Sequence, residues 1–114
     1  MSEESPKRQF YDAQIRYLQA GDVAGLIDNQ YTQDATLISF DNQITGNAAL
    51  KEYFAGYLKM LGSLEVLSTD KFVETDDSLF FQATVKTDLG QAVVFDAWVL
   101  RDGKISHHFT GVMP

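Results

Sequence analysis

An acidic residue, Asp96, lies within an apolar run, VVFDAWV at positions 93–99, that is typical of a β-strand. A carboxyl group in such surroundings must be paired, hydrogen-bonded or protonated, because an isolated buried charge is costly. It can then donate a hydrogen bond or act as an acid toward a bound molecule. Two other arrangements fit the same sequence: Asp96 on a solvated face, or Asp96 paired with Arg16 or Lys86. Asp96 is the first candidate for a catalytic residue.

Two adjacent histidines, His107 and His108, lie on the following predicted strand. Consecutive side chains of a strand point to opposite faces, so these two rings cannot bind one metal ion in regular geometry. If His108 approaches Asp96 from the neighbouring strand, the two form an acid–base pair. The alternative is a hydrogen-bonded histidine with a structural role. No motif indicates a metal, phosphate or dinucleotide site, and we expect neither a metal nor a cofactor.

Helix signals fill the first part of the chain that must position these residues. Ser5 and Pro6 predict an N-cap and a first helical residue, and Gly21 predicts the C-terminal cap. Asp22 predicts the N-cap of a second helix, whose apolar stripe includes Tyr31. The first two helices therefore follow each other directly.

A buried strand and a third helix come next, followed by a strand-rich remainder. The strand is predicted over residues 34–40, with apolar side chains on both faces, so we expect cover on both sides. The helix is predicted from an N-cap at Asn47, after Gly46, to Gly62. Four further strands are predicted at residues 64–74, 79–87, 92–100 and 105–112. This order predicts an α+β fold in which three N-terminal helices pack on a curved antiparallel sheet and leave a conical cavity.

Composition narrows the class of protein and its partners. A length of 114 residues suits one domain, residues 1–114, and 45% hydrophobic residues are enough for a packed core. The formal net charge of −7 disfavours binding to nucleic acid or to an anionic membrane. The chain has no cysteine, and its N-terminus lacks the apolar run of a signal peptide. We therefore expect a soluble cytoplasmic protein.

Several local motifs occur in an order that resembles the nuclear transport factor 2-like superfamily. They are GDV at positions 21–23, YTQDAT at 31–36, Gly46 before the third helix, and DGKI at 102–105. The resemblance spans nearly the whole chain and is to the SnoaL-like and ketosteroid isomerase-like branch. It implies a cone fold, also called a cystatin-like roll, with a central apolar pocket for a small molecule.

The resemblance also implies a homodimer formed through the outer face of the sheet. Side chains alternate between the two faces of a strand, so the residues expected on the face opposite to Asp96 are Val93, Phe95, Ala97 and Val99. If the helices cover one side of the sheet, this row is exposed, and a second copy would cover it.

Ketosteroid isomerase, which combines an aspartate base with a tyrosine and a protonated aspartate, maps onto this chain only in part. The base of the isomerase falls at Ser39, whose hydroxyl cannot serve as that base, although Asp41 could point the same way. The helical tyrosine falls near Gln14, one turn before Tyr17, and the protonated aspartate falls at Asp96. The resemblance therefore argues against a steroid isomerase of the known kind.

The resemblance further assigns side chains to the pocket. It places His108 on the pocket face of its strand with Ser106, Thr110 and Val112, and His107 on the other face with Ile105 and Phe109. The expected substrate-binding residues are Tyr17, Ser39, Tyr57, Trp98 and Thr110. Asp96 and His108 are the expected catalytic residues, as in scytalone dehydratase-like enzymes that use Asp and His.

Three functions remain open at this point. The first is a cofactor-independent isomerase, dehydratase or cyclase that acts on an apolar substrate. Asp96 would act as acid or hydrogen-bond donor and His108 as base, and Tyr17 would orient the substrate. The second is a binding protein for an apolar small molecule without catalysis, and the third is a protein-interaction domain that uses the sheet face. The substrate and the pathway do not follow from the sequence, because this fold hosts many unrelated activities.

Overall fold

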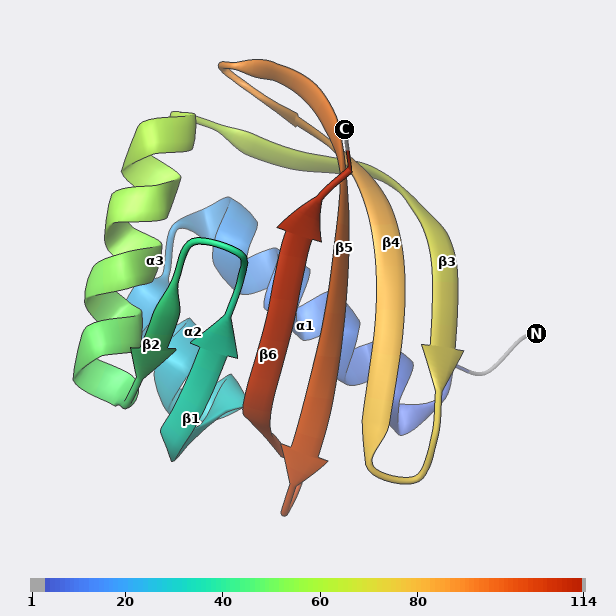
Figure 1. The fold of residues 1–114 in the computed structure, drawn as a ribbon. Helices are drawn as coiled ribbons and strands as arrows, with labels where there is room; N and C mark the ends of the chain where they lie inside the picture. Colours follow the sequence, from blue (N-terminus) through green and yellow to red (C-terminus); the bar gives the residue numbers. More distant parts are fainter. Residues whose placement is uncertain (1–3, 114) are drawn as a thin grey trace.

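The computed structural model describes residues 4–113, which form three α-helices and a six-stranded sheet (Figure 1). The helices are α1 (Pro6–Ala20), α2 (Val23–Gln30) and α3 (Asn47–Leu61). The strands are β1 (Tyr31–Ile38), β2 (Gln43–Thr45), β3 (Leu64–Glu74), β4 (Ser78–Thr87), β5 (Gly90–Arg101) and β6 (Lys104–Val112). The predicted α+β class is confirmed.

Local capping explains where the first two helices begin and end. The Ser5 hydroxyl accepts a hydrogen bond from the backbone N–H of Arg8 at 3.0 Å, and Pro6 opens α1. Gly21 ends α1 with φ at 71°, a left-handed conformation that glycine adopts without steric cost. The Asp22 carboxylate then accepts from the N–H of Gly25 at 2.9 Å and caps α2.

The first strand differs from its prediction over residues 34–40. It begins earlier, at Tyr31, which had been predicted as part of the second helix, and it ends earlier, at Ile38. Phe40 lies beyond the strand in the loop to β2 and is 96% exposed, so the expected cover on both faces fails there. The N-cap of α3 is Gly46 rather than Asn47, which is the first residue of the helix.

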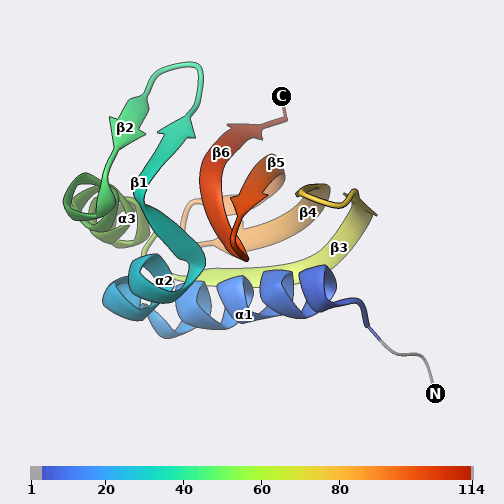
Figure 2. The ribbon, with the colours of Figure 1, turned by 90° about the horizontal axis from the view of Figure 1, so that it is seen from below.

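The strand order across the sheet is β2-β1-β6-β5-β4-β3. All neighbouring pairs are antiparallel except β1 and β6, which run parallel. Register shifts occur between β3 and β4, between β5 and β6, and between β1 and β6. Such irregularities bend strands and increase their twist, and Figure 2 shows the sheet curving around α1.

The helices cover one face of the sheet. Several of the most deeply buried side chains of the core lie at one end of this face. Trp98, Tyr31 and Ile105 are buried there with at most 1% of their surface exposed. They come from the lower ends of β5, β1 and β6 in Figure 1. Ile105 had been expected on the outer face with Phe109, but the register shift between Val99 and Leu100 turns its side chain into the core.

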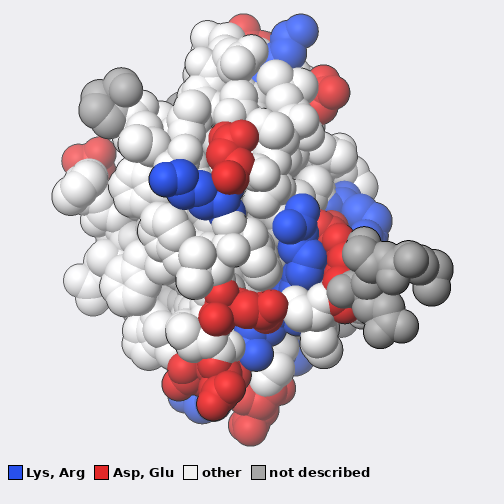
Figure 3. All heavy atoms as spheres, turned by 90° about the vertical axis from the view of Figure 1, so that its right-hand side faces the viewer, with Lys and Arg blue, Asp and Glu red and all other residues white. Residues whose placement is uncertain are grey.

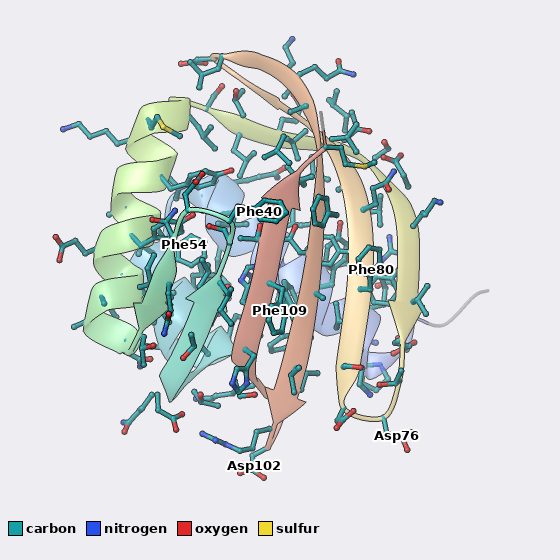
Figure 4. All side chains as sticks on the ribbon, viewed as in Figure 1. Phe40, Phe54, Asp76, Phe80, Asp102 and Phe109 are labelled. Atoms are coloured by element: carbon teal, nitrogen blue, oxygen red, sulfur yellow. The ribbon has the colours of Figure 1, made fainter. Side chains whose placement is uncertain are left out.

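The opposite face of the sheet carries exposed aromatic side chains. Phe80 on β4 and Phe109 on β6 project from the face turned toward the viewer in Figure 4, away from α1. They are 42% and 43% exposed. The side of the molecule seen in Figure 3 instead carries charges of both signs, with acidic side chains gathered toward its lower end. Within residues 4–113, no helix is long and apolar enough to cross a membrane.

Candidate functional site

A cavity of about 380 Å³ lies between the helices and the curved sheet. Its lining comes mainly from the strand ends at the top of Figure 1, where β3 and β5 begin and β4 and β6 end. α1, α3 and the loop after β1 complete the wall. Most lining side chains are apolar, and the volume falls in the range typical of small-molecule sites.

Asp96 lies at the inner end of this cavity, where the cavity meets the packed core. It is 7% exposed, and its Oδ1 is 2.7 Å from Nε2 of His108 on β6. The two residues come together because Trp98 pairs with His108 and Asp96 with Thr110, on adjacent antiparallel strands. Within residues 4–113, no hydrogen bond is formed to the second carboxylate oxygen, Oδ2, and Asp96 is part of the cavity lining.

A chain of buried hydrogen bonds continues behind Asp96. Nδ1 of His108 is 2.8 Å from the hydroxyl of Tyr31, and Nε2 of Gln14 donates to that hydroxyl at 3.0 Å. Gln14 and His108 are 3% and 5% exposed. We call Gln14, Tyr31, His108 and Asp96 the buried relay.

The hydrogen bonds of the buried relay fit one arrangement of protons in which His108 is neutral. Gln14 donates to the Tyr31 oxygen, so the hydroxyl proton of Tyr31 is free to be donated to Nδ1 of His108. A neutral His108 then carries its proton on Nε2 and donates it to Asp96, which accepts as a carboxylate. Both nitrogens of His108 are occupied, so the atom of this pair that faces a ligand is Oδ2 of Asp96.

Tyrosine side chains form much of the wall near Asp96. Tyr53 and Tyr57 on α3 lie with their ring centroids 6.0 Å apart and their planes 7° from parallel. Burial raises the pKa of both hydroxyls. The Asp96 carboxylate raises the pKa of Tyr53 further, and Tyr53 and then Asp96 do the same for the pKa of Tyr57. Burial also raises the pKa of Tyr31 far above its ordinary value, which keeps the relay hydroxyl protonated.

Three polar residues considered from the sequence also line the cavity. Ser39 and Asp41 lie in the loop after β1, and Thr110 lies on β6 beside Asp96. The Ser39 hydroxyl is 3.4 Å from the side-chain nitrogen of Asn42, which can donate to it. Asp41 is exposed, so it stands at the rim rather than beside His108. Tyr57, also expected from the sequence, is part of the wall.

Two other expected substrate-binding residues lie outside the lining. The Tyr17 hydroxyl accepts a hydrogen bond from the side chain of Asn29 at 3.1 Å, on the surface between α1 and α2. Trp98 is 1% exposed and packs edge-on against His108, with 5.7 Å between ring centroids, so it supports the site from within the core. Gln14 lies about one helical turn before Tyr17 on α1, and it is Gln14 whose side chain points into the protein and lines the cavity.

The ion pairs considered for Asp96 are not formed. Arg16 and Lys86 are both exposed, and the partner of Asp96 is His108. Among the described residues, no group of three or more His, Asp and Glu side chains is placed to hold a metal ion.

Sequence reasoning missed the roles of Tyr31 and Gln14. Tyr31 had been assigned to a helix stripe, and Gln14 had been noted only as the counterpart of a tyrosine. A signal was present for Gln14, because a polar residue falls among the inward positions of α1, between Tyr11 and Leu18. A buried amide at such a position needs a polar partner.

Comparisons with known proteins place the fold. No family model matches the chain. Over 84 residues, 74% of the chain, it is 30% identical to the Rqc2 homolog RqcH of Streptococcus pneumoniae serotype 2. The chain spans about 15% of the length of the curated relatives it matches, so the match concerns a small part of those proteins.

Solved structures resemble the chain over nearly its whole length. A nuclear transport factor 2-like protein from Anabaena variabilis has a TM-score of 0.81 at 18% identity, covering 100% of this chain and 95% of that one. A candidate polyketide cyclase from Sinorhizobium meliloti has a TM-score of 0.79 at 12% identity, covering 95% and 100%. TerC, crystallised with polyporic acid, has a TM-score of 0.79 at 19% identity, covering 96% and 92%. The chain therefore has the nuclear transport factor 2-like fold, as its motifs predicted.

Proposed function

We propose that the cavity binds an apolar small molecule and that Asp96 exchanges a proton with it. The reaction would be that of a cofactor-independent isomerase, dehydratase or cyclase. The observation that carries this proposal is the free Oδ2 of Asp96 at the inner end of an apolar cavity, with His108 hydrogen-bonded to Oδ1. Carboxyl groups in such settings are common in acid–base catalysis.

The roles differ from those expected from the sequence, which made Asp96 the acid and His108 the base. With both nitrogens of His108 engaged, the carboxylate of Asp96 is the base that takes a proton from the substrate. The protonated Asp96 then returns that proton to another atom of the substrate or to a departing hydroxyl. His108 is a positioning residue, because its Nε2–H stabilises the carboxylate and holds its orientation.

Two neighbours in fold support a small-molecule role. One is a candidate polyketide cyclase, and the other was crystallised with polyporic acid. Their identities to this chain are 12% and 19%, so they support a class of site rather than a substrate.

The test is a screen for ligands, followed by assays for their conversion. Compounds that raise the melting temperature of the wild type would be incubated with it and analysed by mass spectrometry and NMR. We expect Asp96→Asn to keep the fold and abolish turnover, because an amide can still accept from His108 but cannot take the proton. The matched control is Asp102→Asn, in the β5–β6 turn at the opposite end of the molecule (Figure 4). Full turnover in Asp96→Asn would refute the catalytic role.

A ligand that binds without chemical change would favour the binding-protein alternative. Binding of no small molecule, together with a protein partner on the sheet face, would favour the interaction-domain alternative. The proposal also includes a cytoplasmic location. It further includes no binding to nucleic acid or to a membrane, which the net charge of −7 supports.

A homodimer through the outer sheet face is the other part of the proposal. Strand register places an outer apolar row across this face: Val73, Phe80, Ala97, Phe109 and Ile38. Val73 is 61% exposed, and Phe80 and Phe109 are also exposed (Figure 4). The expected residues Val93, Phe95, Ala97 and Val99 are half-buried on the same face. A second copy would cover this surface.

Sedimentation analysis tests the dimer. We expect Phe109→Asp to shift the protein from dimer to monomer, because a charge would enter the centre of the outer apolar row. Phe40→Asp is the matched control, since Phe40 is 96% exposed and lies outside that row. A monomeric wild type, or a Phe109→Asp variant that stays dimeric, would refute this interface.

A further inference from the structure

Aspartate carboxyl groups and one histidine line the cavity, without a lysine or arginine among the described residues of the lining. Asp96 lies at the inner end and Asp41 at the rim. His108 is committed to the buried relay and donates to Oδ1 of Asp96. With His108 neutral, as its hydrogen bonds in the buried relay indicate, a ligand that enters the cavity meets the carboxylate of Asp96 with no lysine or arginine in the described lining to neutralise it.

The free oxygen of Asp96 determines which chemical group is favoured there. A ligand carboxylate would lose its hydration and be repelled by Asp96, with no arginine or lysine to compensate. A neutral hydroxyl could donate one hydrogen bond to Oδ2. A protonated amine could donate the same bond and also pair with the charge, and charge-assisted bonds are about twice as strong as neutral ones.

The walls suit the apolar body of such a ligand. Phe81 pairs with Asp96 across β4 and β5, and the Phe54 ring lies 6.5 Å from the His108 ring. Both line the cavity together with the stacked rings of Tyr53 and Tyr57 on α3. Aromatic faces attract cations as well as flat apolar groups. The raised pKa of both tyrosine hydroxyls, due first to burial and also to the Asp96 carboxylate, agrees with a negative potential inside the cavity.

We propose that the natural ligand is an amphiphilic amine, whose ammonium group pairs with Oδ2 of Asp96 and whose apolar body fills the cavity. This proposal rests on the proposed function of the same cavity. The net charge of −7 would also attract a cationic ligand to the protein from solution. Binding of this kind does not require turnover.

The test uses three probes with one apolar body: 2-(2-naphthyl)ethylamine, 2-(2-naphthyl)ethanol and 2-naphthylacetic acid. Calorimetry at neutral pH and low salt would measure the Kd of each for the wild-type protein. We expect the amine to bind about tenfold more tightly than the alcohol, because it adds the charge–charge contribution, and the acid to bind most weakly.

Variants separate a contribution of Asp96 from a general preference for cations. We expect Asp96→Asn to bring the amine and the alcohol to similar affinity, and Asp102→Asn to keep the tenfold difference. Equal binding of amine and alcohol to the wild type, or an amine preference that survives Asp96→Asn, would overturn the amine assignment but not the cavity proposal. If Asp96→Asn does not fold, the ranking of the three probes on the wild type still decides the matter. Binding of none of the three would overturn both proposals for ligands of this size.

Discussion

Replacing Tyr31 with phenylalanine tests the buried relay, because this change removes one oxygen and keeps the ring. That oxygen is 3.0 Å from Nε2 of Gln14 and 2.8 Å from Nδ1 of His108. Both partners are at least 95% buried, so neither has ready access to bulk water. Leaving a buried polar group without a partner costs about 1–3 kcal/mol. Two such groups give an expected loss of about 3 kcal/mol in the free energy of unfolding.

Urea denaturation followed by circular dichroism measures this loss. For a domain of this size it corresponds to a fall in Tm of about 10 °C. Tyr53→Phe is the matched control, because the same atom is removed from a half-buried tyrosine of the cavity wall whose hydroxyl has no hydrogen bond within residues 4–113. We expect that control to lose less than about 0.5 kcal/mol. Equal losses in the two variants would refute the relay.

The same variant tests the assigned protonation. In the wild type, we expect ¹⁵N NMR to show His108 as the neutral tautomer with its proton on Nε2, because Tyr31 donates to Nδ1. In Tyr31→Phe, we expect this single tautomer to be lost, because Nδ1 no longer has a donor. A wild-type His108 with its proton on Nδ1 would show that the hydrogen bonds of the relay run in the opposite direction.

Two further predictions concern backbone strain and pH. Gly62→Ala should lower the free energy of unfolding, measured in urea, by at least about 1 kcal/mol more than Gly21→Ala does. Both positions have positive φ, but only at Gly62 would the new Cβ overlap a side chain, that of Asp88. Equal losses in the two variants would contradict this. The free energy of unfolding should fall as pH rises above about 10. Below that pH, both the folded and the unfolded protein hold the Tyr31 proton. Above it, the unfolded chain releases this proton, while burial keeps it bound in the folded protein. Phenolate absorbance checks this: Tyr31→Phe should leave the titration amplitude of the folded protein unchanged, and a loss of one tyrosine's amplitude would contradict the prediction.

The sequence predicts most of the fold because its signals are local. Ser5, Asp22 and Gly21 act within one helical turn of their own positions, and each cap occurs where it was predicted. The start of β1 was wrong because Tyr31 fits either a helix stripe or a strand. Its pairing with Ile105, far along the chain, decides for the strand. The side chain of Ile105 was also misplaced, because a register shift between strands leaves no mark in residue periodicity.

The site was predictable where strand parity alone determines it. Asp96 and His108 lie on neighbouring strands, and their side chains point to the same face of the sheet. The prediction of the last hairpin therefore also predicts that the two side chains lie close together. Gln14 and Tyr31 were missed because they lie on other elements, and the curvature of the sheet brings them to His108. Alternation along a strand says which face a residue occupies, but not which helix lies opposite it.

The position of Asp96 at the boundary between core and cavity allows one carboxylate to be buried and also to face a ligand. On one side, Trp98 and the buried relay exclude water and hold Oδ1 in place. On the other side, the cavity leaves Oδ2 open to a ligand. Ser39, the position at which the sequence resemblance places the base of ketosteroid isomerase, lines the cavity but has a hydroxyl that cannot take that role. Under the proposed function, proton transfer in this cavity would therefore start from Asp96 on β5, where His108 holds the carboxylate in place.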